Sequence, residues 1–384
     1  MSGPLKILLL GDYSNCQRTL ATGLRKLGCD VTLISDGSSW QNCQRDIDIS
    51  RRPGKLGGIE LFLKLNTSLR KYLKGYDIVS VHDPNCVSLR PELIKIIFDR
   101  LKRDNGAVFL NAMSNDVPFL DMLADPDCPL AYNEWFVAGK PTRLYYENIK
   151  EWQDWHNESL KKYHQYFYEH VDGAVSVLYE YHLGLERVLP ADKIAYGGIP
   201  IDLELFEPVK LPEKIDKVRL FLGRDRTRML VKGSDYLEQA ARTVIERHPD
   251  KAELVLVENR PFDEFVSLLK SAHVVLDQIY SYTPATTALM AMAYGLNVVT
   301  GGEEDFYNFI GEHDNKPIIN APTDLESLTD TIERVVLNSD QIAERGRLSR
   351  QFVEKHNECT VVAQRYLNLW TKHLRSCSHS ISPL

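Results

Sequence analysis

Two stretches of the sequence contain residue types that could hold a phosphate group. The first runs from Ser281 to Thr300, SYTPATTALMAMAYGLNVVT, where a polar turn leads into a predicted helix rich in small residues. Thr286 and Thr287 stand at the start of that helix. A helix N-terminus presents free N–H groups and the positive end of the helix dipole, so it stabilises a bound anion. A helix start that binds nothing would contain the same residues, so this stretch alone leaves both interpretations open.

The second stretch is a basic loop, GRDRTRMLVKG, that follows the strand-like run VRLFLG. We expect its first residue, Gly223, to let the chain turn. The loop contains four cations: Arg224, Arg226, Arg228 and Lys232. Guanidinium forks and a lysine ammonium group suit the oxygens of a diphosphate. Because both stretches follow strands of one predicted sheet, they could hold the same diphosphate from two sides.

Strand-like apolar runs alternate with helix-period segments along almost the whole chain, which indicates an α/β protein with parallel sheets. The first half contains the runs LKILLLG, DVTLIS, YDIVSVHD, GAVFLNA and GAVSVL, with helices expected near residues 17–27, 59–73 and 91–102. The second half contains VRLFLG, AELVLV, HVVLDQ and LNVVTG, with helices expected near residues 236–247, 263–272 and 325–338. The pattern therefore predicts two Rossmann-like, doubly wound parallel-sheet domains.

The chain of 384 residues is too long for one ordinary core. A break rich in Gly and Pro, GGIPID, begins at Gly197 and is followed by PVKLPEKIDK, which suits an interdomain linker. We place the first domain at residues 1–197 and the second at 198–359. Between Met113 and Gly173 lies an insertion rich in Trp and Tyr, and its first part is irregular enough to be a substrate-facing loop. Its aromatic residues could pack in a core or stack on a sugar.

Ligands of open parallel sheets sit beyond the carboxyl ends of the strands. In the first domain those positions are the segments 11–15, 82–85 and 111–116. A reaction that needs a general base could draw on four side chains there: Asp12, His82, Asp83 and Asp116. Capping of an ordinary loop would suit the same residues.

The formal net charge of −7 disfavours a general nucleic-acid binder. The charge is uneven, because residues 1–145 contain 19 Lys and Arg against 16 Asp and Glu, and the rest contain 27 against 37. Two basic clusters of the first domain could touch an anionic membrane face or an anionic acceptor, or could simply be solvated. They are Arg51, Arg52 and Lys55, and Arg100, Lys102 and Arg103.

Neither a membrane span nor an export signal is apparent, so we expect a cytoplasmic protein that could lie at the inner face of the membrane. Seven scattered cysteines without a C-x-x-C pair argue against a disulfide framework and a zinc site. Asp83, Asp116 and Asp277 stand at different strands without a D-x-D pair. We therefore expect no metal and no cofactor.

Taken together, these motifs resemble the GT-B glycosyltransferases, in particular the large retaining group called family 4. The resemblance covers nearly the whole chain and is strongest in Met290–Val299, Gly223–Gly233 and the segment that begins KILLLGDYSNCQ. It implies that Arg228 and Lys232 neutralise the donor's pyrophosphate. It also implies that the C-terminal helix, near residues 360–376, packs back on the first domain.

The remaining candidates combine what the resemblance implies for Gly11–Asn15, Phe262, Thr286 and Thr287 with residues taken from the basic loop and the strand ends. The donor side would comprise Gly223, Arg224, Arg226, Phe262 near the nucleobase, Asp277, Tyr282, Thr286 and Thr287 at the distal phosphate, and Met290. The sugar and acceptor side would comprise Gly11, Asp12, Tyr13, Ser14, Asn15, Asn111 and Ser114. His82 and Asp116 are the further catalytic candidates.

One departure from the family concerns its paired glutamates, which would fall at Tyr282 and Met290. Neither residue can replace a carboxylate. Asp277, Glu303 or Glu304 could compensate. The departure puts the ribose contact and the donor's identity in question.

The expected function is transfer of a sugar from a nucleoside diphosphate donor to a glycan or lipid-linked acceptor, with retention of configuration. Such a reaction depends on electrostatic stabilisation of the leaving phosphate. The main alternative is a sugar- or nucleotide-binding relative that has lost catalysis with the paired glutamates. A sugar-nucleotide epimerase fits no better, and the single glycine of LLLGDYSNCQ argues against a dinucleotide-dependent enzyme.

Overall fold

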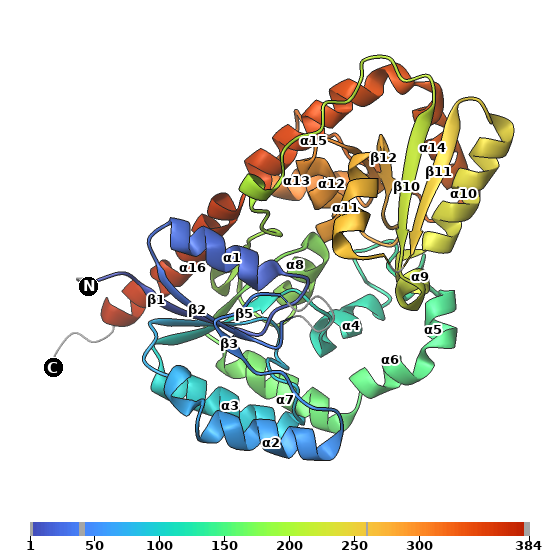
Figure 1. Cartoon of the computed structure of the whole chain (residues 1–384). Coiled ribbons are helices and arrows are strands. Elements are labelled where there is room, and N and C mark those ends of the chain that lie inside the picture. Colours follow the sequence, from blue (N-terminus) through green and yellow to red (C-terminus); the bar gives the residue numbers. More distant parts are fainter. Residues whose placement is uncertain (1–2, 38–42, 259, 380–384) are drawn as a thin grey trace. The chain divides into compact units, whose positions relative to one another are not determined.

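The computed structural model describes residues 3–37, 43–258 and 260–379. The chain divides into two compact units (Figure 1). The first contains the residues up to Met122, Lys150–Asp202 and the chain from Cys359 onward. The second contains Leu123–Ile149 and Leu203–Glu358. The segment Leu123–Ile149 thus belongs to the second unit, whereas a single division at Gly197 would leave it in the first.

The first unit is built on a seven-stranded sheet in the order β3-β2-β1-β4-β5-β8-β9. All its neighbouring strands are parallel. The strands are β1 Lys6–Leu10, β2 Asp30–Ser35, β3 Ile47–Asp48, β4 Ile78–Val81, β5 Ala107–Ala112, β8 Gly173–Ser176 and β9 Ile194–Tyr196. Both faces of the sheet are covered, which is why its central strands read as continuous apolar runs.

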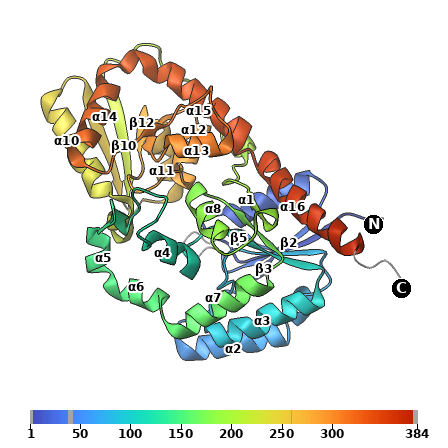
Figure 2. The ribbon, with the colours of Figure 1, turned by 180° about the vertical axis from the view of Figure 1, so that it is seen from behind.

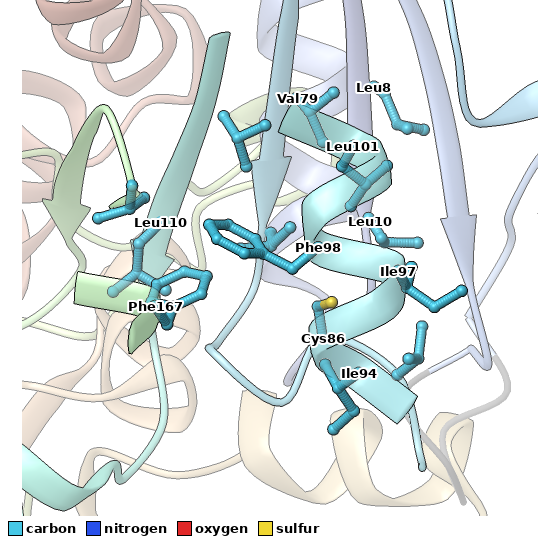
Figure 3. Close-up of a cluster of buried hydrophobic side chains, with 14 of the residues drawn as sticks. Leu8, Leu10, Val79, Cys86, Ile94, Ile97, Phe98, Leu101, Leu110 and Phe167 are labelled. Atoms are coloured by element: carbon cyan, nitrogen blue, oxygen red, sulfur yellow. The ribbon is translucent and has the colours of Figure 1, made fainter. Parts of the chain in front are cut away.

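Helices α2, α3 and α7 lie on one face of this sheet, and α1 and α16 lie on the other (Figures 1 and 2). On the first face, Phe98 and Phe167 meet with ring centroids 4.7 Å apart, in a cluster that also contains Leu8 and Leu10 of β1 (Figure 3). On the other face, the Tyr366 hydroxyl of α16 donates a hydrogen bond to Asn111 Oδ1 at 2.7 Å. The helices are α1 Cys16–Lys26, α2 Gly54–Asn66, α3 Pro91–Asp104, α4 Val117–Leu123, α6 Ile149–Trp155, α7 Glu158–His170, α8 Tyr179–Glu186 and α16 Cys359–His379.

The second unit is built on a five-stranded parallel sheet in the order β11-β10-β12-β13-β14. Its strands are β10 Val218–Arg224, β11 Ala252–Glu258, β12 Val274–Leu276, β13 Asn297–Thr300 and β14 Ile319–Asn320. Its helices are α5 Arg143–Glu147, α9 Met229–Lys232, α10 Ser234–Arg247, α11 Phe262–Lys270, α12 Thr286–Ala293, α13 Glu304–Ile310, α14 Leu325–Leu337 and α15 Ile342–His356. A hairpin of β6 Phe136–Val137 and β7 Lys140–Pro141 completes the regular strands.

The predicted α/β class with two Rossmann-like parallel sheets is confirmed. Short 3₁₀ turns connect several elements: η2 Arg70–Tyr72, η3 Ala191–Lys193, η4 Leu203–Leu205, η5 Arg226–Arg228 and η6 Ser339–Gln341. The helix expected near residues 59–73 was misplaced, because it begins at Gly54 and ends at Asn66, and η2 follows separately. Within the described residues, no helix is both long and apolar enough to cross a membrane.

A buried carboxylate ties two elements of the second unit together. Glu312 follows α13 and is 1% exposed, and its Oε2 accepts hydrogen bonds from Lys355 at 2.6 Å and His356 at 2.7 Å, both in α15. Its Oε1 accepts from the backbone N–H groups of Asp314 and Asn315. Burial alone would raise the pKa of this carboxyl, but these hydrogen bonds lower the pKa to about 2.

We predict that Glu312→Gln lowers the free energy of unfolding of the second unit by about 3 kcal/mol at pH 7. The pKa of Glu312 is lower in the folded state than in the unfolded state. Its stabilisation is therefore fully present above about pH 4.5 and is lost as the pH falls towards 2. Urea unfolding curves at pH 7, 4 and 2.5 should show that the difference in unfolding free energy between variant and wild type becomes smaller as the pH falls. Glu344→Gln, in an exposed pair with Arg347, should change little. A gap that did not depend on pH would contradict the prediction.

Candidate functional site

The carboxyl edge of the second sheet carries the helix start that the sequence pointed to. Helix α12 begins at Thr286, and its N-cap residue is Ala285, which makes no side-chain cap hydrogen bond. Thr286 and Thr287 are half-buried, and Met290 lies one turn further along. The small residues Ala288, Ala291 and Ala293 are buried against the sheet. The first turn of this helix thus has no side-chain cap of its own and lies beyond the carboxyl end of β12.

Two of the predicted phosphate-binding arginines have carboxylate partners in the structure. Arg224 forms ion pairs with Glu238 of α10 and Glu258 of β11. The pairing with Glu258 follows from strand register, because these two residues are direct neighbours on β10 and β11. Arg226 Nη2 lies 3.1 Å from the same Glu258. Arg224 is therefore paired with two carboxylates within the fold, whereas the Arg226 side chain has one such contact and stays 73% exposed.

Gly223 does not turn the loop as expected. It lies inside β10, opposite Val257 of β11, and a Cβ at this position would come within 2.7 Å of the Phe265 ring. The strand continues through Arg224 because its hydrogen-bonded register with β11 continues that far. The glycine is needed for close packing of α11 on the strand.

Lys232, in α9, is held at the carboxyl edge of the sheet by an acidic residue. Its Nζ lies 2.7 Å from Oδ1 of Asp277, which directly follows β12 and has a side chain only 1% exposed. The Thr300 hydroxyl at the end of β13 lies 3.4 Å from the other carboxylate oxygen. Arg228, at the start of α9, is exposed and has no carboxylate partner among the described residues. Arg228 is thus exposed and without an ion pair among the described residues, whereas Lys232 would have to share its contact with Asp277 to meet an anion.

The first part of the aromatic insertion, Leu123–Ile149, forms what we call the aromatic strap. Tyr132 stacks on Tyr282 with ring centroids 4.7 Å apart and an interplanar angle of 31°. The Tyr132 hydroxyl donates to Glu303 Oε1 at 2.7 Å, and the backbone N–H of Ala131 donates to the Tyr282 hydroxyl at 2.7 Å. Burial raises the pKa of Tyr282 to about 12, so its hydroxyl stays neutral. Tyr282, at one of the two glutamate positions, therefore anchors the strap.

A second anchor of the strap lies beside the basic loop. Arg143 Nη2 donates to Asp235 Oδ2 at 2.7 Å, and its guanidinium lies 4.6 Å from the centroid of the Tyr236 ring. Both partners are in the first turn of α10. The strap therefore contacts segments that follow β10, β12 and β13, all at the carboxyl edge of this sheet. In the sequence, the aromatic-rich insertion was the one signal for the strap, and the contacts of Tyr132 and Arg143 were not predicted.

The carboxyl edge of the first sheet gathers a separate acid–base cluster. Gly11 has φ +83°, and a Cβ there would come within 1.8 Å of His82 Nδ1, so only glycine lets β1 and β4 end so close together. His82 Nε2 lies 3.8 Å from Asp83 Oδ2, and the Ser114 hydroxyl donates to the same oxygen at 2.9 Å. The structure thus brings together His82 and Asp83, which follow β4, and Ser114, which follows β5.

Asp12 adjoins this cluster. It is 4% exposed, and its Oδ1 accepts from the backbone N–H of Gln17 at 2.8 Å. Its Oδ2 is buried and has no hydrogen-bond partner among the described residues. Burial raises the pKa of Asp12. Next to it, Tyr13 is 41% exposed, and Ser14 and Asn15 adopt left-handed backbone conformations with φ of 52° and 65°.

Two further candidates have partners that fix them in the core. Asp116 accepts hydrogen bonds from the backbone N–H of Phe119 at 2.9 Å and from the Tyr168 hydroxyl. Burial raises the pKa of Asp116 to about 6. Asn111 is 1% exposed and accepts a hydrogen bond from the Tyr366 hydroxyl.

Phe262 begins α11, but its side chain lies outside the described residues. No group of three His, Cys, Asp or Glu side chains in the described chain is arranged as a metal site.

The fold is that of GT-B proteins of known structure. A sucrose-phosphate synthase from Thermosynechococcus elongatus shares 14% sequence identity with this chain and superposes on it with a TM-score of 0.62. The match covers 97% of this chain and 100% of that chain. The catalytic domain of starch synthase IV from Arabidopsis thaliana, bound to ADP and acarbose, is 11% identical with a TM-score of 0.61 over 97% and 100%. HepE from Anabaena, in complex with UDP and glucose, is 12% identical with a TM-score of 0.57 over 96% and 100%. Neither a protein-family model nor the sequence of a curated protein matches the chain.

We predict that Tyr132→Phe loosens the strap, because the Glu303 carboxylate loses a hydrogen-bond donor worth roughly 1 to 3 kcal/mol. Limited proteolysis should cut within residues 123–149 about tenfold faster than in the wild type. Tyr146→Phe is the matched control, since Tyr146 lies in the same strap and is 69% exposed. Equal cleavage rates in both variants would mean that the Tyr132 hydroxyl does not anchor the strap.

Proposed function

We propose that the protein is a glycosyltransferase that moves a sugar from a nucleoside diphosphate donor to a glycan or lipid-linked acceptor. The observation that carries the proposal is the pairing of Lys232 with Asp277 at the carboxyl edge of the second sheet, the edge from which α12 also starts. A cation and a helix N-terminus at one sheet edge suit a diphosphate. The GT-B fold supports the proposal, and structures with this fold contain UDP or ADP.

The donor's diphosphate would be bound by three groups. Lys232 would exchange part of its contact with Asp277 for a phosphate oxygen, Arg228 would approach from solvent, and the free N–H groups of Thr286 and Thr287 would hold the distal phosphate. Fixed positive charge at this position stabilises the leaving diphosphate as its bond to the sugar breaks. Arg224 and Arg226 would act indirectly, by holding β10, β11 and α10 in register through Glu238 and Glu258.

Glu303 is the best candidate to replace the missing glutamates. Asp277 is paired with Lys232, and Glu304 is paired with Lys316. Glu303 instead accepts neutral hydrogen bonds, from Tyr132 and from Asn320 at 2.6 Å, and its backbone N–H donates to Tyr282 O. Its carboxylate thus makes no ion pair with the described residues and lies beside Tyr282, where it could accept a hydrogen bond from a hydroxyl of the donor.

The acceptor side of the reaction belongs to the first unit. Asp12, His82, Asp83 and Ser114 offer hydrogen-bond acceptors and donors at a sheet edge where Tyr13 is exposed. We propose transfer with retention, like the family 4 group, because Arg228 and Lys232 can stabilise the leaving phosphate without a protein base. Polysaccharide or glycolipid assembly in the cytosol is the setting that the resemblance implies. The alternative, a binding protein without catalysis, is favoured by one observation, the loss of both glutamates at Tyr282 and Met290.

The diphosphate assignment is tested by calorimetry with UDP, GDP, ADP and CMP and their sugar conjugates. We expect one nucleoside diphosphate to bind. The Lys232→Ala variant should bind it at least tenfold more weakly, since a charge-assisted contact is worth roughly 1.5 to 3 kcal/mol. Lys214→Ala is the control, because Lys214 is an 89% exposed lysine of the same unit. Unchanged affinity in Lys232→Ala would exclude the assignment. Binding without donor turnover would favour the non-catalytic alternative.

Retention is tested on the product formed by an active donor and acceptor pair. We expect NMR to show the donor's anomeric configuration in the product. We also expect His82→Asn to lower kcat by less than tenfold, because the leaving phosphate can take the acceptor's proton. An inverted product, together with a loss in kcat of a hundredfold or more, would instead identify His82 as the general base.

A further inference from the structure

Helix α2 carries an exposed aliphatic ridge that its own fold does not use. Its buried face is Gly57, Leu61 and Leu65, which pack into the core of the first unit. Leu56, Ile59 and Leu63 point elsewhere and are 81%, 55% and 55% exposed. Their spacing of three and four residues places them on one side of the helix. Figures 1 and 2 show α2 as an outer element of its unit, next to α3.

The ridge lies in the most basic part of the chain. From Arg51 to Lys74 there are seven basic residues and one acidic residue, Glu60, in a protein whose net charge is −7. The basic residues are Arg51, Arg52, Lys55, Lys64, Arg70, Lys71 and Lys74. They lie at both ends of the ridge. Arg51, Arg52 and Lys55 lie at or just before the start of α2, and the other four lie in its last turn or in the segment around η2.

Little of this positive charge is cancelled within the fold. Arg51 donates to the backbone carbonyls of Ser88 and Gly54, which fixes the guanidinium without neutralising it. The Arg52 side chain is 83% exposed, and its Nε lies 3.9 Å from Glu60. Glu60 also pairs with Lys64 at 2.8 Å. By contrast, two of the three residues in the second basic cluster predicted from the sequence form ion pairs, Lys102 with Asp172 and Arg103 with Asp104.

We propose that α2 and the basic residues around it form a docking surface for an anionic lipid bilayer. Aliphatic side chains with a basic border are the pattern of helices that lie in the plane of a membrane interface, with the apolar side among the lipid chains. The basic residues meet the negative surface potential of anionic headgroups. A helix of 13 residues is about 20 Å long, against about 30 Å for the hydrocarbon core, so it lies on the bilayer.

An aromatic residue at the edge of this surface supports the same geometry. Tyr72 in η2 is 39% exposed, and Lys71 Nζ lies 4.7 Å from the centroid of its ring. Tyrosine rings are favoured at the headgroup level of membranes. Nucleic acid would use the basic residues but would leave Leu56, Ile59 and Leu63 in water. The inference does not depend on the proposed glycosyl transfer.

The test is co-sedimentation of the full chain with vesicles of phosphatidylcholine alone or mixed with 30% phosphatidylglycerol. We expect binding to the anionic vesicles only, with affinity falling as salt is raised. The triple variant L56S/I59S/L63S should bind at least tenfold more weakly. The triple variant Arg70→Ala, Lys71→Ala and Lys74→Ala should bind roughly a hundredfold more weakly, because each basic residue near the surface contributes about 1 kcal/mol, or about a factor of five.

Two controls keep the result specific. Leu205→Ser removes an equally exposed leucine, at 63%, from the second unit and should bind vesicles like the wild type. Circular dichroism should show that the ridge variant is folded. The proposal is overturned if the wild type fails to bind anionic vesicles or binds neutral vesicles equally well. It is also overturned if the ridge variant, L56S/I59S/L63S, binds anionic vesicles as tightly as the wild type. It is also overturned if the ridge instead mediates self-association in solution, seen as a concentration-dependent mass that the ridge variant lacks.

Discussion

Parallel pairing of strands is the constraint on which the rest of this structure depends. Parallel neighbours cannot be joined by a hairpin, so each strand must be followed by a crossover, and the helices of those crossovers cover both faces of the sheet. All strands of a sheet then end at the same edge. Residues far apart in the chain, such as Lys232, Asp277 and Thr300, meet at that edge for this reason alone.

The carboxyl edges also concentrate charge, and the fold pairs most of it. Arg224 is satisfied by Glu238 and Glu258, because register places Glu258 beside it on β11 and α10 brings Glu238 across. A cation held in this way positions backbone, whereas a cation such as Arg228 stays available. The distinction matters for function, because a cluster of arginines in sequence overstates the number of groups that can bind an anion.

The aromatic strap gives Tyr282 a structural role. Its ring lies against that of Tyr132, its hydroxyl accepts a hydrogen bond from the backbone N–H of Ala131, and the Tyr132 hydroxyl donates to Glu303. The strap and the carboxyl edge of the second sheet therefore fit one another, and the Glu303 carboxylate lies beside Tyr282.

The sequence by itself determined the fold class, the central strands and the two candidate phosphate-binding stretches, because alternation of apolar runs and helical periods is a local property of the chain. It could not place the edge strands β3 and β14, which are two residues long and owe their pairing to neighbours. Tertiary structure alone decided that Gly223 lies within a strand, that Asp116 caps α4 against Tyr168, and that Leu123–Ile149 joins the second unit. Each of these depends on which residue of a distant segment comes within contact distance, and the order of residues along the chain does not encode that directly.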